Sequence, residues 1–301
     1  MLQELQIQRC PKLISTLPEN LPCLDRLVIS ACQVLEDSLP WVPRLRELEL
    51  TGCDSFKSLP GKMIQGNTCL QTVAIRNCSS LVTIPEGGLS STLRSLDIYE
   101  CRNLKLFPHQ HLQGQHHCIS LERLHLKYCC NSLISFPLSF FTKLEDLRLQ
   151  DCNNLQVISN APESLPYLRK LKLKECSKLV LFPEGGLPTP MLESLSISRC
   201  ANISPYATWG LEMMASLASL SISGLTGFTS LEHTGIQCLS SLKILKIKDC
   251  KTLESLPLEA LATSLSHLTI RACPLLQQRC KRDSGDYWNL ISCIPSIVIE
   301  D

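Results

Sequence analysis

The chain has 301 residues, 44% of them hydrophobic and only 5% aromatic, so its core must be built from aliphatic side chains and cysteine. Its 29 Lys and Arg nearly balance its 28 Asp and Glu, and a net charge of +1 provides no overall field for nucleic acid or an anionic membrane. No apolar run reaches the roughly 18–20 residues that span a bilayer, and the beginning of the chain lacks the apolar core of a signal peptide. We therefore expect a soluble chain, cytoplasmic or shared between cytoplasm and nucleus, with no nucleic acid and no membrane as partner.

A leucine-rich pattern begins with the first residues and repeats along almost the whole chain. Its form is LxxLxLxxC, then an apolar residue, then an apolar residue followed by proline, as in Leu45–Pro60 and Leu168–Pro183, which align without a gap. The spacing of about 24 residues falls within the roughly 20 to 29 residues of leucine-rich repeats. Twelve repeats start at Leu2, Leu24, Leu45, Leu70, Leu93, Leu121, Leu144, Leu168, Leu192, Leu217, Leu242 and Leu265.

Each repeat contains a predicted strand, because its last two leucine-type positions lie two residues apart. Leu48 and Leu50, for example, point to one face of a strand, and Glu49 points to the other. One repeat alone buries too little apolar surface to offset the entropy of ordering its backbone, so neighbouring repeats must stack. The predicted fold class is an α/β-type leucine-rich-repeat solenoid of about twelve repeats, with a parallel β-sheet on its concave face.

A cysteine follows the predicted strand in eleven of the twelve repeats, and Leu225 takes its place in the tenth. These cysteines recur singly in a long chain, so we expect buried reduced thiols that donate to loop carbonyls rather than a disulfide framework. The prolines that follow should stop any helix or ladder and leave the convex side mostly irregular or 3₁₀. The cysteines are Cys10, Cys32, Cys53, Cys78, Cys101, Cys129, Cys152, Cys176, Cys200, Cys250 and Cys273, and the prolines are Pro18, Pro40, Pro60, Pro85, Pro108, Pro137, Pro183 and Pro257.

Both ends of the chain differ from an average repeat. Leu2 already lies inside a repeat, with no polar cap before it, which predicts a fragment of a longer polypeptide. Residues 278–301 depart from the pattern and supply Trp288, Ile291 and Ile294 together with a strand-like ending. We expect a solenoid over residues 1–277 and a capping segment over residues 278–301.

Three features together resemble a known family. They are the repeat LxxLxIxxCxxLxxLP, the PEGGL turns at Pro85–Leu89 and Pro183–Leu187, and the ending YWNLISCIPSIVIE at Tyr287–Glu300. The chain resembles the C-terminal region of plant intracellular nucleotide-binding leucine-rich-repeat disease-resistance proteins of the coiled-coil type. The resemblance implies a region that recognises a pathogen effector or a guarded host protein and restrains a nucleotide-binding module of the same polypeptide. This chain contains no GxxxxGK[ST] phosphate loop, so ATP binding cannot be assigned to it.

The residues between the inward leucines form columns on the expected concave face, which is the natural place for a protein partner. Basic side chains gather there in repeats six to eight and again in repeat eleven, and they predict a docking patch for an acidic surface. The alternative is an ordinary solvated face, because lysine is common on exposed strands. The predicted partner-binding residues are Tyr99, His125, Lys127, Arg148, Lys172, Lys174, Lys246 and Lys248.

Other chemistry-bearing residues have simpler explanations. The histidine-rich insert His109–Cys118 has no CxxC or HExxH spacing, so we read it as a polar loop rather than a metal site. Cys129 and Cys130 read as buried thiols, and Gly87–Gly88 and Gly185–Gly186 read as turns. His125 beside Glu122 or Asp97 has the composition of an acid–base pair, but an open wall lacks a pocket that excludes water. We expect no enzyme activity, no catalytic residue, no metal and no cofactor.

The function predicted is therefore a protein-binding recognition scaffold of a plant immune receptor. The alternative is the substrate-recognition solenoid of an F-box type ubiquitin-ligase adaptor, which also uses repeats with cysteine. Sequence upstream of this chain would discriminate the two, because an F-box favours the adaptor and a nucleotide-binding module favours the receptor.

Overall fold

The chain forms two compact units. The computed structural model describes residues 2–13, 21–32, 42–59, 64, 67–84, 89–106, 120–159, 165–180, 187, 189–206 and 208–300. Unit 1 consists of Met1–Leu133 and Phe140–Cys152, and unit 2 consists of Ile134–Ser139 and Asn153–Asp301.

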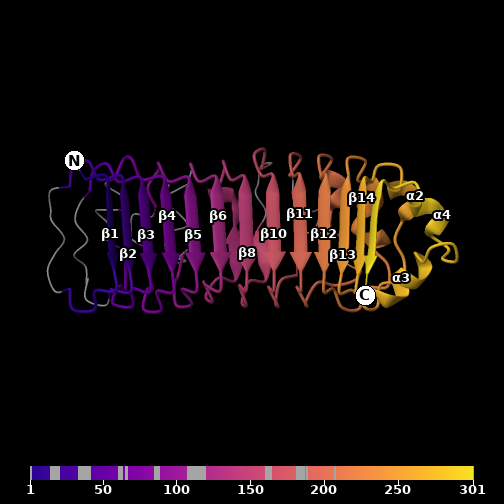
Figure 1. The fold of residues 1–301 in the computed structure, drawn as a ribbon, viewed down its shortest axis with the longest axis horizontal. Helices are drawn as coiled ribbons and strands as arrows, with labels where there is room; N and C mark the ends of the chain where they lie inside the picture. The colour runs from indigo at the N-terminus through magenta and orange to yellow at the C-terminus, as the bar shows by residue number, and fades with distance from the viewer. Residues whose placement is uncertain are drawn as a thin grey trace. The chain divides into compact units, whose positions relative to one another are not determined.

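Unit 1 is built on parallel strands of five residues, one from each successive repeat. Neighbouring strands pair in register, so that Leu48 of one strand lies beside Leu27 before it and Val73 after it. Figure 1 shows these strands side by side and pointing the same way. In order across the sheet they are β1 Glu4–Gln8, β2 Arg26–Ser30, β3 Glu47–Thr51, β4 Thr72–Arg76, β5 Ser95–Tyr99, β6 Arg123–Lys127 and β8 Asp146–Gln150.

Unit 2 repeats this arrangement, again with parallel strands in register (Figure 1). A second, two-stranded sheet pairs β7 Ser135–Pro137 with β9 Val157–Ser159, and Pro137, which has no N–H to donate, is the last residue of its strand. The strands of the main sheet are β10 Lys170–Lys174, β11 Ser194–Ser198, β12 Ser219–Ser223, β13 Ile244–Lys248, β14 His267–Arg271 and β15 Ser296–Glu300.

Alternation along each strand separates the core from the solvent, as the sequence predicts. Leu48 and Leu50 of β3 are buried, whereas Glu49 between them is partly exposed. The inward leucines and isoleucines of consecutive strands therefore stack on one another, and each unit is a leucine-rich-repeat solenoid built on a main parallel sheet. Leu5 and Ile7 of β1 are only partly buried, because β1 is the edge strand of its sheet.

The cysteines after the strands are buried, which confirms the prediction for every repeat cysteine except the partly exposed Cys10. Their thiols reach backbone carbonyls, as in Cys53, whose Sγ lies 3.5 Å from the oxygen of Thr51 and 3.7 Å from that of Ile29. No disulfide joins the described cysteines, which are all free thiols.

The residue before the cysteine position adopts a left-handed conformation in all twelve repeats, and the sequence analysis missed this. Gly52 and Gly224 occupy the position at φ 61° and 64°, but Arg, Ala, Asn, Glu, Tyr and Asp also occur there with φ between 50° and 55°. The turn aims the N–H of this residue at the last carbonyl of the next strand, as in Gly52 to Arg76 at 2.8 Å. This hydrogen bond offsets the energetic cost of the left-handed conformation and links each repeat to the next.

The side opposite the strands is built from short pieces, as predicted for a mostly irregular or 3₁₀ convex side. Six of the eight prolines that were expected to stop a helix or a strand ladder lie outside the described residues, whereas Pro257 stands immediately before a short helix. The 3₁₀ segments are η2 Leu138–Phe140, η3 Leu211–Met213, η4 Glu232–Thr234 and η5 Ile236–Cys238, and the one-turn helix is α2 Leu258–Leu261.

The last part of unit 2 contains two further short helices, α3 Pro274–Arg279 and α4 Trp288–Ile291, before β15. The expected boundary between residues 277 and 278 falls within α3. Of the predicted capping residues, Ile291 and Ile294 are buried and Trp288 is partly buried. Across the described residues, every helix falls short of the length and apolar character that a bilayer crossing requires.

Candidate functional site

The side chains that alternate with the buried leucines form the open face of each sheet. All eight predicted partner-binding residues lie on this face and are partly or fully exposed. In unit 1, Tyr99 lies on β5, His125 and Lys127 on β6 and Arg148 on β8. In unit 2, Lys172 and Lys174 lie on β10, and Lys246 and Lys248 on β13.

Two of the predicted basic side chains on the open face of unit 1, His125 and Arg148, are paired with acids. His125 lies between two carboxylates, with its Nδ1 2.6 Å from Asp97 Oδ1 and its Nε2 3.5 Å from Asp146 Oδ1. Arg148 donates two hydrogen bonds to Asp146, from Nε to Oδ1 at 3.0 Å and from Nη2 to Oδ2 at 2.8 Å. We call Asp97, His125, Asp146 and Arg148 the ion-pair cluster. Its charges largely cancel, so it is a mixed surface rather than a free basic patch.

The cluster shifts the pKa values of its members. Hydrogen bonding to Asp146 and then to Asp97 raises the pKa of His125 from 6.5 to about 9, although burial opposes the shift. Burial alone would raise the pKa of Asp146, but hydrogen bonds from His125 and Arg148 outweigh it and lower this pKa to about 2. His125 is therefore a cation at neutral pH, with its Nδ1 against Asp97 and its Nε2 within ion-pair distance of Asp146.

An aromatic group borders the ion-pair cluster on the same three strands. The rings of Tyr99 and Tyr128 meet edge to face with centroids 5.7 Å apart, and Lys127 Nζ lies 5.1 Å and 5.6 Å from the two centroids. Gln150 Nε2 donates to the Tyr128 hydroxyl at 3.2 Å. This group offers a partner a fixed apolar surface with a cation held above it, which is typical of the residues that contribute most to protein interfaces.

The first strands of unit 1 carry a second set of ion pairs on the open face. Arg26 lies 2.8 Å from Glu4, 3.3 Å from Glu47 and 3.6 Å from Glu49, and Arg76 also pairs with Glu49. These pairs are well exposed, so each contributes little to stability, about 0–1 kcal/mol.

The open face of unit 2 differs, because most of its lysines lack an acidic partner. Lys174 Nζ lies 3.5 Å from Glu175, which also accepts from Arg199 at 3.1 Å. Lys172, Lys246 and Lys248 make no ion pair with any residue in the part of the chain that the structure describes. Three of the four predicted lysines of unit 2 thus make no ion pair among the described residues, whereas His125 and Arg148 of unit 1 do.

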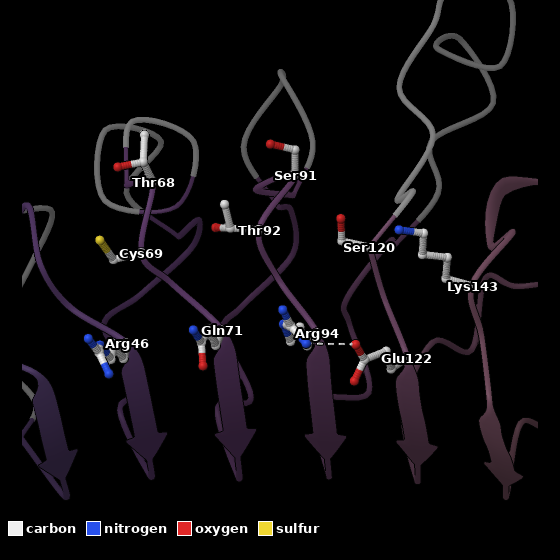
Figure 2. A pocket seen from close by; sticks show the side chains of 10 residues that line it. All are labelled: Arg46, Thr68, Cys69, Gln71, Ser91, Thr92, Arg94, Ser120, Glu122 and Lys143. Atoms are coloured by element: carbon white, nitrogen blue, oxygen red, sulfur yellow. Dashed lines mark hydrogen bonds and ion pairs between the residues drawn. The ribbon is translucent and has the colours of Figure 1, made fainter.

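A polar groove of about 440 Å³ lies at the start of β3 to β6 in unit 1 (Figure 2). Arg46, Gln71, Arg94 and Glu122 each stand immediately before one of these strands, and Arg94 Nη1 pairs with Glu122 Oε1 at 3.0 Å. The remaining lining residues come from the connecting segments and from the turn before β8. They are Thr68, Cys69, Ser91, Thr92, Ser120 and Lys143. Exposed cations and hydroxyls suit polar groups at the edge of a partner rather than a buried small molecule.

In the described part of the chain, no group of three or more His, Cys, Asp or Glu side chains is arranged so that it could hold a metal ion. The insert His109–Cys118 and the glycine pairs at residues 87–88 and 185–186 lie outside that portion. Cys129 and Cys130 are both buried, and a hydrogen bond between them together with burial raises the pKa of Cys129. That thiol remains protonated, which disfavours redox chemistry.

Sequence reasoning missed Asp146 and Tyr128 as members of the face. Asp146 occupies the first outward position of β8, a column that the sequence analysis did not read, in register with Arg123 and Ser95. Tyr128 follows β6 and is held over the face by its left-handed φ of 51°. Reading all outward columns across the repeats would have placed Asp146 diagonally beside His125.

No family model matches the chain. It is similar in part to three curated Arabidopsis thaliana proteins. It is 32% identical over 115 residues to the disease-resistance candidate At3g14460, a match that covers 38% of this chain and 8% of that protein. It is 28% identical over 160 residues to disease resistance protein RPS6, covering 51% of this chain and 13% of that protein. It is 30% identical over 149 residues to disease resistance protein RPP4, covering 48% of this chain and 12% of that protein.

Among solved structures, the leucine-rich-repeat domain of the type III effector XopL matches 77% of this chain and 69% of its own, with a TM-score of 0.44 and 19% identity. A Leptospira interrogans leucine-rich-repeat protein matches 98% of this chain and 89% of its own, with a TM-score of 0.40 and 17% identity. The chain spans only 8 to 13% of the length of the curated relatives named above. The repeats and the partial matches to the disease resistance proteins support a leucine-rich-repeat scaffold for protein interactions that is similar in sequence to plant disease resistance proteins.

Proposed function

We propose that the chain is the protein-recognition region of a plant immune receptor and that it binds a pathogen effector or a guarded host protein through its open face. The observation that carries the proposal is that the inward and outward residues of each strand have different roles. Inward leucines hold the sheet, while the outward positions hold rings, acids and bases that take no part in the core. The chemistry of the binding face can therefore change without loss of the fold.

The sequence matches support the receptor over the F-box adaptor, because At3g14460, RPS6 and RPP4 are named for disease resistance. In a longer polypeptide, this region would also contact a nucleotide-binding module, and the receptor would act in the cytoplasm or the nucleus. We propose no catalysis for the chain itself, since its most pKa-shifted histidine, His125, is already held between two carboxylates on an open surface.

A capture experiment tests the proposal. The tagged chain would be incubated with extracts of pathogen-treated and untreated plant tissue, and bound proteins would be identified by mass spectrometry. We expect a specific partner that is lost with the double variant Tyr99→Ala, Lys127→Ala, because this variant removes one ring and the cation of the aromatic group.

The matched control is Arg102→Ala, Lys105→Ala, which alters two exposed residues of unit 1 outside the main sheet. We expect it to retain the partner. Equal capture by both variants and the unmodified chain would reject the aromatic group of unit 1 as part of the binding surface. Capture of ubiquitin-ligase subunits by the full-length protein would favour the adaptor instead.

A further inference from the structure

On the open face of unit 2, two strands that carry outward lysines lie on either side of two strands that carry outward serines. The central strands, β11 and β12, carry serine at every outward position. β10 pairs with one side of this pair of strands and β13 with the other, so the residues form continuous rows across four strands. One row is Lys172, Ser196, Ser221 and Lys246, and the next is Lys174, Ser198, Ser223 and Lys248. We call this surface the lysine–serine trough.

The register gives the trough its dimensions. Parallel strands lie about 4.8 Å apart, so β10 and β13 are separated by about 14 Å, and five residues extend about 16 Å along each strand. Serine side chains are short and lysine side chains are long, so the lysines form two walls above the serine floor. An α-helix with its side chains is about 10–12 Å wide and would fit lengthwise between them.

The polar groups of the trough are largely unpaired. Ser223 Oγ donates to Asp249 at 3.3 Å, and the other five serine hydroxyls make no hydrogen bond with any described residue. Lys170 adds a further cation to the β10 wall, and like Lys172 and Lys246 it forms no ion pair within the described ranges. Acidic side chains stand just beyond the strand ends: Glu175 and Asp249 follow β10 and β13, and Glu193, which pairs with Arg169, precedes β11.

We propose that the lysine–serine trough binds an acidic segment of a partner protein, whose carboxylates reach the lysine walls on both sides while its backbone or small side chains rest on the serines. This inference rests on the proposed function and names the chemistry of the partner. Ammonium groups and hydroxyls are donors that match carboxylates. A nucleic acid is less suited, because no aromatic side chain occupies an outward position of β10 to β13 for a base to stack on.

The test uses the whole chain and a fluorescent peptide in which glutamate and alanine alternate, with a peptide of glutamine and alanine as the uncharged probe. We expect binding of the glutamate peptide alone, weakened by added salt. The variant Lys172→Glu, Lys246→Glu reverses one charge on each wall and should weaken binding about tenfold or more. The control Lys251→Glu, Lys281→Glu makes the same change in net charge at exposed lysines outside the four strands and should have less than about a twofold effect.

A second variant distinguishes binding within the trough from a general effect of the chain's positive charge. Ser221→Tyr keeps every lysine and fills the floor, so it should also weaken binding, and circular dichroism would show that the variant remains folded. The inference is overturned if the wall and control variants weaken binding equally, if Ser221→Tyr binds as the unmodified chain does, or if single-stranded oligothymidine binds more tightly than the peptide. Any of these results, combined with partner capture that still depends on Tyr99 and Lys127, would reject the trough and leave the proposed function standing.

Discussion

The imidazole of His125 and the carboxylate of Asp97 lie 2.6 Å apart although they belong to different repeats. The contact exists because β5 and β6 pair in register, which places these two residues directly side by side on the open face. Asp146, one strand further along, holds the other nitrogen at 3.5 Å. A histidine in this position is a cation that ties three strands together.

This arrangement predicts a loss of stability at alkaline pH. The pKa of His125 is raised in the folded chain from 6.5 to about 9, so its contribution is complete below pH 6.5 and disappears as the pH rises through about 9. The free energy of unfolding would be measured with denaturant at pH 6.5 and at pH 9 for the unmodified chain and for His125→Gln. We expect the unmodified chain to lose about 1–3 kcal/mol between these pH values and the variant to lack this change. Asp146→Asn should lower the His125 pKa measured by NMR. An unchanged value would contradict the ion-pair cluster.

The left-handed turn before each cysteine predicts a cost for β-branched residues. Gly52 has φ 61°, and a Cβ added there would meet nothing closer than 3.8 Å, so the penalty comes from the backbone alone. We expect Gly52→Val to lower the free energy of unfolding by about 1–2 kcal/mol. Gly52→Asn should cost clearly less, since asparagine tolerates this conformation. Equal destabilisation by the two substitutions would contradict the assignment to backbone strain.

Replacement of Asn67, which is buried and precedes Thr68 of the groove, should have a larger effect. Its Nδ2 donates to the carbonyl of Val42 at 2.8 Å, and its Oδ1 accepts from the N–H of Cys69 at 2.8 Å. Asn67→Ala leaves both backbone groups unsatisfied and should cost about 2–4 kcal/mol in thermal or denaturant unfolding. The control is Asn103→Ala, which removes an exposed bond to Ser79 that water can replace and should cost less than about 1 kcal/mol. A similar loss in both variants would argue against the buried role of Asn67.

The differing exposure of the cysteines predicts that they react with a maleimide at different rates. Cys238 and Cys293 are exposed and should be labelled within minutes in the native chain, whereas Cys53, Cys152 and Cys250 are buried and should require unfolding. Peptide mapping by mass spectrometry after timed labelling would measure the order. Rapid native labelling of Cys152 would show that the repeats do not close over their thiols.

The repeat pattern was enough to predict the strands, their inward residues and the burial of the cysteines, because the period is local and applies to every repeat. Leu48, Leu50 and Cys53 are where the pattern places them. The left-handed turns were not predictable, because glycine occupies this position only at Gly52 and Gly224. Residues such as Arg199 adopt the same conformation because their N–H bonds to the neighbouring strand.

The charge pattern of the candidate site was only partly predictable. The outward positions of His125 and Arg148 followed from alternation, but their pairing with Asp146 depends on three strands and on side-chain rotamers. Lys172 and Lys246 were also expected to be outward, and the structure adds that the serines between them form one continuous floor.

The turn that aims Gly52 at Arg76 and Asp249 at Arg271 has a consequence for how many coils the chain can hold. Every coil presents the same donor to the same acceptor of the coil beside it, so whole coils are interchangeable at their junctions. The addition or deletion of a whole coil would therefore leave a fully bonded array, and it would change the set of outward side chains that the chain displays.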